Sequence, residues 1–301
     1  MQHLSSSQQE VRIAIKLYHC DEIGHCDETG GSVNWKSEFN LVALKCFKNL
    51  KLQYYALSVL IGLIFGCGTI ASALTVMPIG DSNTFGYGDA GVGSTEGYRM
   101  PLDQLMQQSG IQIQYVGGEV DTRASGYGNN HHEGHIGWTI DDIINGRDGK
   151  SPMSWLYAIQ PDVVLLMIGT NDLSVGHDVG YMQWRMSYLL DVIHFYSPRS
   201  KIIVGSLLPF VQIPYYLGQE PQAWNPFNAS IDQFNGFLAN EVSSRQRRGI
   251  QIRLANVNGY VSYDKMSDFN SNYGWIGLAV HADQLGYRFM AYAWLAQLAG
   301  F

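Results

Sequence analysis

Three short segments, far apart in the chain, carry the side chains needed to transfer an acyl group. Ser82 ends a Gly-Asp-Ser sequence, Asn171 lies within Gly-Thr-Asn-Asp, and His281 begins His-Ala-Asp-Gln-Leu-Gly-Tyr. A serine hydroxyl becomes a good nucleophile when a neighbouring base removes its proton, and an imidazole can act as that base. A carboxamide donates hydrogen bonds to a developing oxyanion without carrying a charge. The three residue types together predict one acyl-transfer site.

Two apolar runs place the serine and the asparagine. Residues 74–79 end at Gly-Asp-Ser, and residues 162–168 end at Gly-Thr-Asn-Asp. Near-continuous apolar runs of this length are typical of parallel strands covered by helices on both faces. Ligands bind outside the carboxyl ends of such strands. We therefore expect Ser82, at the turn from strand to loop, and Asn171 to share one crevice.

The rest of the chain alternates between strand-like and helix-like segments. Five apolar runs are expected to be strands, at residues 74–79, 111–116, 162–168, 201–208 and 250–257. Helices are expected at residues 98–109, 139–145, 151–159, 181–196, 231–244 and 284–298. This alternation predicts an α/β fold with a parallel sheet between two helical layers. No internal repeat divides residues 74–301, which we expect to form one catalytic domain.

Composition argues against a nucleic-acid-binding protein and against a disulfide-stabilised catalytic region. The net charge is −7 and the pI is about 5.7, with no dense Lys/Arg stripe after residue 74, so nucleic acid is not an expected partner. All four cysteines lie within the first 67 residues, so no disulfide framework is expected in the catalytic region.

An export signal is expected ahead of the catalytic domain. Residues 54–73 carry no charge, follow three lysines and end in Ala-Ser-Ala, which is typical of a cleaved secretory signal. The stretch is also long enough for an uncleaved membrane anchor. We therefore expect a polar tail at residues 1–43, a signal or anchor at 44–73, and a domain that is secreted or displayed outside the cell. The membrane is a partner only if residues 54–73 are retained.

These motifs resemble the SGNH (GDS-like) hydrolases over roughly residues 74–301. The family's blocks are a serine in G-D-S, a glycine, an asparagine in G-x-N-D and a C-terminal histidine. Within the family, the wording of three segments is most similar to carbohydrate esterases of the acetyl xylan esterase type: Met77 to Ser82, His135 to Ile140, and Val163 to Asp172.

The resemblance implies a fold, a reaction and a role for each site residue. It implies a three-layer α/β/α fold with a five-stranded, flavodoxin-like sheet in the order 2-1-3-4-5. It implies that Ser82 is the nucleophile and His281 the general base, and that the oxyanion hole is formed by Ser82, Gly137 and Asn171. Asp81 and Asp172 support these residues, and no metal or cofactor is implied. The implied substrate is an acetylated carbohydrate such as xylan.

The sequence departs from the family pattern at one position. The family usually has an aspartate three residues before the histidine to orient the imidazole, and Leu278 occupies that position here. A Ser-His dyad is therefore expected, with a backbone carbonyl or a more distant acid holding the other ring nitrogen. Asp264 and Asp268 are candidate acids, and Asp283 is a weaker one.

Several alternatives stay open at this point. Gly86 to Gly91 spells G-x-G-x-x-G, which would suit a dinucleotide-binding oxidoreductase. Leu278 would also suit a non-catalytic, carbohydrate-binding relative. His131, His132 and His135 look like loop residues lining the cleft and form a rival cluster that could bind zinc. The aromatic residues of the 209–228 connection could stack on sugar rings or pack the loop onto the domain.

Overall fold

The computed structural model describes residues 72–87, 96–121, 128–213, 222–223, 225–266 and 277–299. The expected tail at 1–43 and nearly all of the expected signal or anchor at 44–73 lie outside these ranges, so both stay predictions. Within the described ranges, no helix combines the length and apolar character needed to cross a bilayer.

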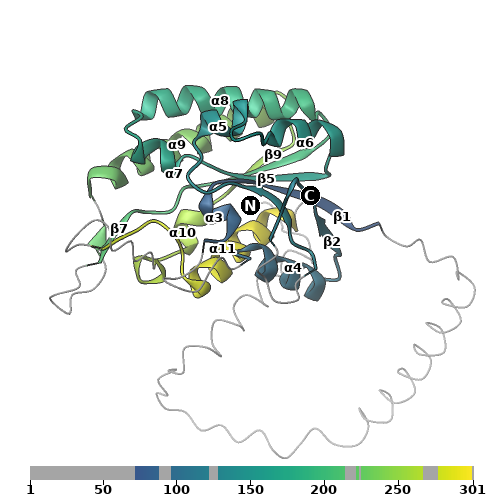
Figure 1. Ribbon diagram of the computed structural model, residues 1–301, viewed down its shortest axis with the longest axis horizontal. Helices are drawn as coiled ribbons and strands as arrows, with labels where there is room; N and C mark the ends of the chain where they lie inside the picture. The colour runs from purple at the N-terminus through teal and green to yellow at the C-terminus, as the bar shows by residue number, and fades with distance from the viewer. Residues whose placement is uncertain are drawn as a thin grey trace, which may run out of the picture. The chain divides into compact units, whose positions relative to one another are not determined.

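A parallel-dominated sheet forms the centre of the domain, with helices on both faces (Figure 1). β1 (Leu74–Gly80) pairs in parallel with β5 (Val163–Met167), β5 with β6 (Lys201–Gly205), and β6 with β9 (Ile252–Ala255). All five residues of β5 are buried, as expected for a strand that helices cover on both sides. The α/β class and the central strand order predicted from the sequence are confirmed.

The other side of β1 is built from two short strands instead of one. β2 (Ile113–Tyr115) pairs with the beginning of β1, and β4 (His131–Gly134) pairs with its end. β3 (Glu119–Val120) adds an antiparallel edge to β4, which gives seven strands where five were expected. Only Ile113–Tyr115 of the 111–116 run forms a strand, and it pairs with β1 from Leu74 to Val76 alone. β4 was not predicted from the sequence, because its residues are polar.

Two helical layers cover the sheet. α5 (Ile140–Asn145), α6 (Pro152–Ile159), α8 (Val179–Tyr196) and α9 (Asn225–Arg247) lie on one face. α4 (Arg99–Gln108), α10 (Val257–Tyr260) and α11 (Gln284–Leu298) lie on the other (Figure 1). Side chains cap two of these helices: Asp178 accepts from the Tyr181 N–H at the start of α8, and Asp283 accepts from the Gly286 N–H at the start of α11.

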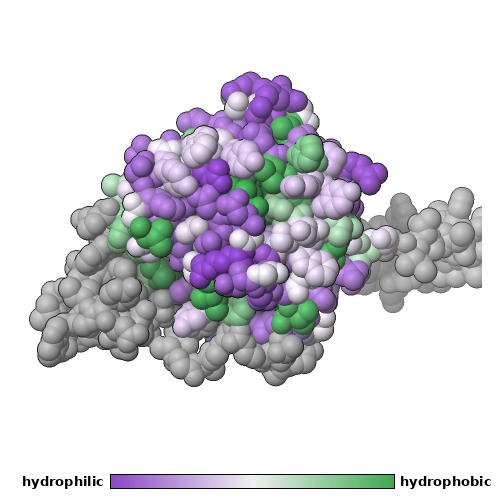
Figure 2. Space-filling model, turned by 45° about the horizontal axis from the view of Figure 1, so that its top comes forward, coloured by the Kyte–Doolittle hydropathy of each residue, from purple (hydrophilic) through white to green (hydrophobic). Residues whose placement is uncertain are grey.

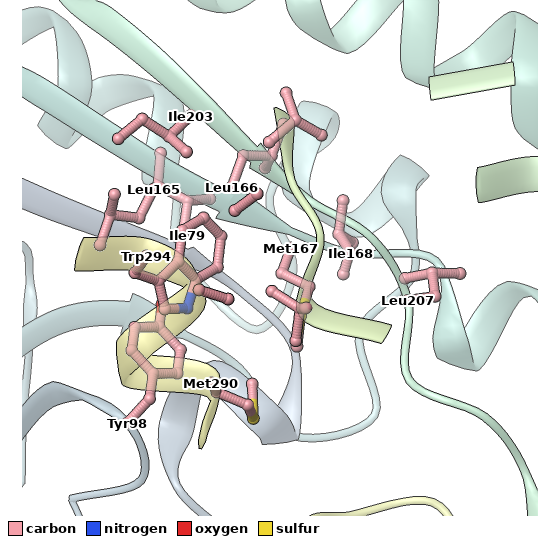
Figure 3. Packing of buried hydrophobic residues seen from close by; sticks show 14 of the residues in the cluster. Ile79, Tyr98, Leu165, Leu166, Met167, Ile168, Ile203, Leu207, Met290 and Trp294 are labelled. Atoms are coloured by element: carbon pink, nitrogen blue, oxygen red, sulfur yellow. The ribbon is translucent and has the colours of Figure 1, made fainter. Parts of the chain in front are cut away.

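The core between α4, α11 and the sheet is built around one tryptophan. Trp294 of α11 is fully buried, and its ring centroid lies 5.4 Å from that of Tyr98, which immediately precedes α4 (Figure 3). A Cβ on Gly205 of β6 would come within 2.6 Å of the Trp294 ring, so the indole packs directly on the strand backbone. This contact fixes α11, and with it the segment that precedes α11, against the sheet.

A small second sheet lies beside the main one. β7 (Val211–Ile213) pairs antiparallel with β8 (Gln222–Ala223) and with β10 (Gly277–Ala279). Phe210, just before β7, is buried and packs 4.9 Å from Phe227 of α9. This part of the 209–228 connection therefore packs onto the domain, whereas Tyr215, Tyr216 and Trp224 lie outside the described residues.

Candidate active site

Ser82 lies at a tight junction between β1 and a one-turn helix, α3 (Ser82–Phe85). The Asp81 side chain caps this helix by accepting from the Asn83 N–H at 2.9 Å. A Cβ on Gly80 would come within 2.1 Å of the Met167 carbonyl oxygen, so only glycine lets β1, β5 and α3 approach so closely. The sequence placed Ser82 in a loop. It is instead the first residue of a helix, where its N–H faces no acceptor within the helix.

His281 lies between β10 and α11 and reaches the serine. Its Nε2 lies 2.6 Å from the Ser82 Oγ, although 199 positions separate the two residues in the chain. The Asn83 side chain donates to the Val280 carbonyl at 3.2 Å, which ties the histidine segment to the nucleophile helix. The structure therefore brings together the two residues that the sequence assigned to nucleophile and base.

The imidazole of His281 is also held from the side. The ring of Tyr87 lies 4.8 Å from it, centroid to centroid, and the backbone carbonyl of Tyr87 accepts from the Tyr287 hydroxyl at 2.9 Å. Two residues after His281, the Asp283 N–H donates to the Lys265 carbonyl at 2.8 Å. Tyr87 and Tyr287 were not predicted to be site residues, because nothing in their local pattern indicates contact with a histidine elsewhere in the chain.

Asp81 places a buried carboxyl group close to this pair. Burial is the largest influence and raises its pKa, while the Asn83 N–H, the charge of His281 and the Thr170 side chain act in the opposite direction. Asp81 therefore lies within electrostatic reach of His281, and its supporting role stays a prediction.

Gly137 lies in the exposed turn that joins β4 to α5. Its φ is +76°, a conformation that glycine adopts readily, and a Cβ built there would meet no atom within 4 Å. Its backbone is therefore open to a ligand. Asn171 lies on α7 (Thr170–Ser174), and its Nδ2 donates at 2.9 Å to the carbonyl of Trp138, the residue after Gly137. An amide nitrogen carries a second hydrogen, which leaves Asn171 one further donor.

Asp172, the residue after Asn171, also binds the turn that carries Gly137. Its Oδ2 accepts from the Ile140 N–H at 3.0 Å, and its Oδ1 lies 3.2 Å from the Nδ1 of His177. Burial raises the pKa of Asp172 to about 6, against the opposing effect of these two partners. Asn171 and Asp172 thus connect β5 to the turn that carries Gly137, and the positions of two predicted oxyanion donors are coupled.

The histidines before Gly137 form structural contacts rather than a loop cluster. His131 and His132 belong to strand β4, so the expectation that they are loop residues is wrong. Buried His135 stacks on Trp138 with centroids 3.9 Å apart, and its Nε2 lies 3.0 Å from the Oε2 of buried Glu133. Glu133 also accepts from the Gly118 N–H. A run of polar residues gives no sequence signal that Glu133 and His135 form a buried pair. The pair comes just before the Gly137 turn.

No cluster of three or more histidine, cysteine or acidic side chains suitable for a metal occurs among the described residues. Gly86, the first glycine of the G-x-G-x-x-G sequence, ends α3 in a left-handed conformation. It therefore belongs to the exit of the nucleophile helix. Gly88 and Gly91 lie outside the described ranges.

Of the three acids that could replace the usual aspartate, two have other hydrogen-bond partners and one lies outside the described residues. Asp264 accepts from the Ser262 hydroxyl and from the Lys265 ammonium, and both contacts lower its pKa. The Asp283 Oδ1 accepts from the Gly286 N–H at 2.6 Å. Asp268 lies outside the described residues. Leu278 lies in β10, opposite Gln212 of β7.

Comparison with known proteins places this arrangement in a family. A model of the GDSL-like lipase/acylhydrolase family matches residues 79–289. The chain belongs to this family. The matched range of the acylhydrolase domain contains Ser82, Gly137, Asn171 and His281, and the family resemblance seen in the sequence is confirmed.

Two curated relatives match the acylhydrolase domain over part of their own length. It is 28% identical over 251 residues to a multidomain esterase of Ruminococcus flavefaciens, which covers 77% of this chain but 29% of that protein. It is 28% identical over 158 residues to a putative endoglucanase X of Acetivibrio thermocellus, covering 49% of this chain and 57% of the relative. The chain thus spans less than two thirds of either relative.

Solved structures share the fold of the acylhydrolase domain. A Clostridium thermocellum family 3 carbohydrate esterase superposes with a TM-score of 0.56 at 24% identity, covering 74% of this chain and 94% of that one. A family 3 carbohydrate esterase from Talaromyces cellulolyticus gives a TM-score of 0.57 at 21% identity, covering 75% and 97%. At these identities the likeness establishes the three-layer fold.

Proposed function

We propose that the domain is a serine carboxylic ester hydrolase that removes short acyl groups, acetyl above all, from carbohydrate. The observation that carries the proposal is the 2.6 Å approach of His281 Nε2 to Ser82 Oγ at the carboxyl edge of the sheet. It joins a nucleophile to a base in a chain whose family consists of lipases and acylhydrolases. The same contact argues against a non-catalytic descendant.

In the first half of the reaction, His281 Nε2 takes the proton of the Ser82 hydroxyl as Oγ bonds to the acyl carbon. The carbonyl oxygen becomes an oxyanion, which the N–H groups of Ser82 and Gly137 and the Asn171 amide are proposed to bind. When the intermediate collapses, the bond between the acyl carbon and the alcohol oxygen breaks. The departing alcohol receives the proton from Nε2, and the acyl group remains on Ser82.

In the second half, water replaces the alcohol. His281 Nε2 takes a proton from water as its oxygen bonds to the acyl carbon, and the same donors stabilise the second oxyanion. Collapse breaks the bond to Ser82 Oγ, which recovers its proton from the imidazolium. The free acid leaves. Asp81 is proposed to support both halves from its buried position beside the pair.

The substrate class is proposed from the relatives. The fold neighbours include family 3 carbohydrate esterases, and one curated relative is a multidomain esterase. These names, together with the wording of the sequence motifs, support an acetylated plant polysaccharide such as xylan. Residues 54–73 support action outside the cell, after export or at a membrane anchor; the mass and location of the mature protein test this part.

The test is hydrolysis of an aryl acetate and of acetylated xylan by the wild type, three single variants and one double variant. Ser82→Ala and His281→Ala are each expected to abolish nearly all turnover, and the double variant to lose little more, since the two side chains act as one unit. Asn171→Ala is expected to lower kcat by about 10²- to 10³-fold. A chelator is expected to leave the wild-type rate unchanged. Retention of most activity in Ser82→Ala would refute the mechanism.

A further inference from the structure

The outer face of α8 carries a row of aromatic rings that begins beside the active site. Tyr181, Trp184 and Tyr188 are spaced by three and four positions, which places them on one side of the helix, and His177 lies just before the first turn. The His177 and Tyr181 rings lie 4.8 Å apart, and those of Tyr181 and Trp184 lie 5.8 Å apart. These four residues are called the α8 ridge.

The inner face of the same helix already serves the core, so the ridge is not needed for folding. Val179, Met182, Met186 and Leu189 are buried against the domain. By contrast, Trp184 is 61% exposed and Tyr188 is 47% exposed. A helix with apolar side chains on both faces normally has a partner on both. Large exposed rings arranged in a continuous row therefore indicate a ligand surface.

The ridge is held in place before any ligand arrives. The Asp141 carboxylate of α5 accepts from the Tyr181 hydroxyl and also pairs with Arg185. The Arg185 guanidinium in turn lies 5.0 Å from the Trp184 ring centroid and 5.1 Å from that of Tyr188. Cation–π contacts and an ion pair thus fix the rings, and little side-chain entropy remains to be lost on binding.

One end of the ridge touches the catalytic machinery. His177 Nδ1 lies 3.2 Å from Asp172, the residue directly after Asn171. The other end opens into a surface depression of about 690 Å³. Its walls include Tyr157, Tyr188, Phe195 and Tyr196, together with the polar side chains of Asn145, Ser151, Ser154 and Asp191. At 1.5 Å per residue, the 18 residues of α8 span about 27 Å, which is the length of several sugar rings.

The chemistry of this surface selects a polysaccharide over a protein. The large exposed apolar side chains along α8 are all aromatic: Trp184, Tyr188, Phe195 and Tyr196. Figure 2, which turns this helical layer toward the viewer, shows hydrophilic, pale and hydrophobic residues intermixed instead of one apolar patch. A sugar ring has an apolar C–H face that stacks on an aromatic ring and hydroxyls at its rim that bind polar neighbours. Alternating rings and polar groups match both features.

We propose that the α8 ridge and the adjoining depression bind the backbone of a polysaccharide and lead it to the oxyanion side of Ser82. The ridge would give the enzyme a preference for polymeric over small acetate esters. This inference rests on the proposed carbohydrate esterase function, because it names where the rest of the substrate lies. It does not depend on the reaction itself, so binding can be measured without turnover.

Binding is tested in the Ser82→Ala background with acetylated xylan and with the same xylan after chemical deacetylation, by affinity gel electrophoresis. Trp184→Ala and Tyr188→Ala are each expected to weaken binding to both xylans by about tenfold, the effect of losing a stacked ring. Trp184→Phe should recover part of the loss. The matched control is Tyr260→Ala, which removes a ring that is 42% exposed on α10, in the opposite helical layer, and should bind like the parent.

Kinetics in the active enzyme separate the ridge from the catalytic residues. Trp184→Ala and Tyr188→Ala should raise KM for acetylated xylan by about tenfold while kcat/KM for an aryl acetate stays within about twofold, because the small ester does not reach the ridge. Unchanged binding to both xylans, or equal losses on polymer and aryl acetate, would overturn the proposal. So would light scattering that shows a dimer separated by Trp184→Ala, because a second copy would then be the occupant.

The outcomes for the ridge and for the proposed function can be told apart. If the wild type cleaves the aryl acetate but not acetylated xylan, the substrate proposal fails. The ridge still stands if deacetylated xylan binds in a manner that depends on Trp184. If acetylated xylan is cleaved but neither ridge variant alters binding, the esterase proposal stands and the ridge is refuted.

Discussion

Catalysis in this domain depends on how two side chains are held, and each is fixed from more than one side. Ser82 is placed by the Asp81 cap and by the close packing that Gly80 permits. His281 is placed by the Asn83 contact to Val280 and by the Tyr87 ring. Geometry rather than intrinsic reactivity is what distinguishes Ser82 from the other serines of the chain.

The first prediction at this scale concerns the residue that orients the imidazole. Asp264 and Asp283 already serve other partners, so we predict that Asp264→Asn and Asp283→Asn leave kcat on an acetate ester within about tenfold. Asp268→Asn is expected to behave in the same way. Removing the acid of a true triad costs about 10⁴-fold. Steady-state kinetics of the three variants provide the measurement.

One result would contradict the dyad. If kcat collapses in a single aspartate variant whose melting temperature matches the wild type, that aspartate is the third member of a triad. The pH profile of kcat in the same variant would then report the altered imidazole, which a structural effect alone would not change.

Among the helices and strands, α3 matters most to the active site because it carries Ser82. It is too short to be stable on its own. Its last carbonyls are held by a buried arginine at the start of α4: Arg99 donates to Thr84 O at 3.3 Å and to Phe85 O at 3.1 Å. Arg99 also lies 3.9 Å from Asp121, and both side chains are fully buried. β4 closes the other side, where a Cβ on Gly134 would come within 2.4 Å of the Phe85 nitrogen.

We predict that Arg99→Met lowers the free energy of unfolding by about 3–5 kcal/mol, because it breaks the buried ion pair with Asp121 and removes the donor to the carbonyls of α3. Urea denaturation provides the measurement. Arg147→Met is the matched control: Arg147 is 47% exposed and pairs with Asp142 and Asp148 at 3.4 Å, and its removal should change stability by less than about 1 kcal/mol. Equal losses in the two variants would show that Arg99 does not brace α3.

At the scale of the whole molecule, two buried groups act on stability in opposite directions as the pH falls. Burial, aided by the charge of Arg99, lowers the pKa of His132 to about 2, so His132 is neutral when folded and gains a proton only on unfolding. Its contribution to stability is present above about pH 6.5 and is lost as the pH falls. Asp172, with a pKa of about 6, is protonated in the folded state first, so its contribution grows as the pH falls from 6 to about 4.

The two effects should nearly cancel between about pH 4 and 6, each changing stability by about 1.4 kcal/mol per pH unit, and His132 alone should act below pH 4. We predict that Asp172→Asn makes stability fall steadily below about pH 6.5, and that His132→Asn, whose amide oxygen can still accept from the Gly134 N–H, flattens the loss below pH 4. Urea denaturation from pH 3.5 to 7 tests both. A variant curve parallel to the wild type would refute the role given to that group.

Much of the architecture could be predicted because apolar periodicity is a local property. The run at 74–79 lies within β1, the run at 162–168 contains β5, and the expected helix at 284–298 is α11 with the same bounds. β4 could not be predicted. Its residues are polar, and they form a strand because β2 leaves the end of β1 unpaired and because Glu133, His132 and His135 find partners only in the folded protein.

The sequence by itself determined the alternation of strands and helices and the kinds of side chain available for acyl transfer. Only the tertiary structure decided that His281, rather than His131, His132 or His135, reaches Ser82. Only it decided that Asn171 and Asp172 hold the turn carrying Gly137. The physical reason is that periodicity is set by neighbours along the chain. The distance between an imidazole and a hydroxyl 199 positions apart is set instead by how α11 packs, through Trp294, on β6 and on Tyr98.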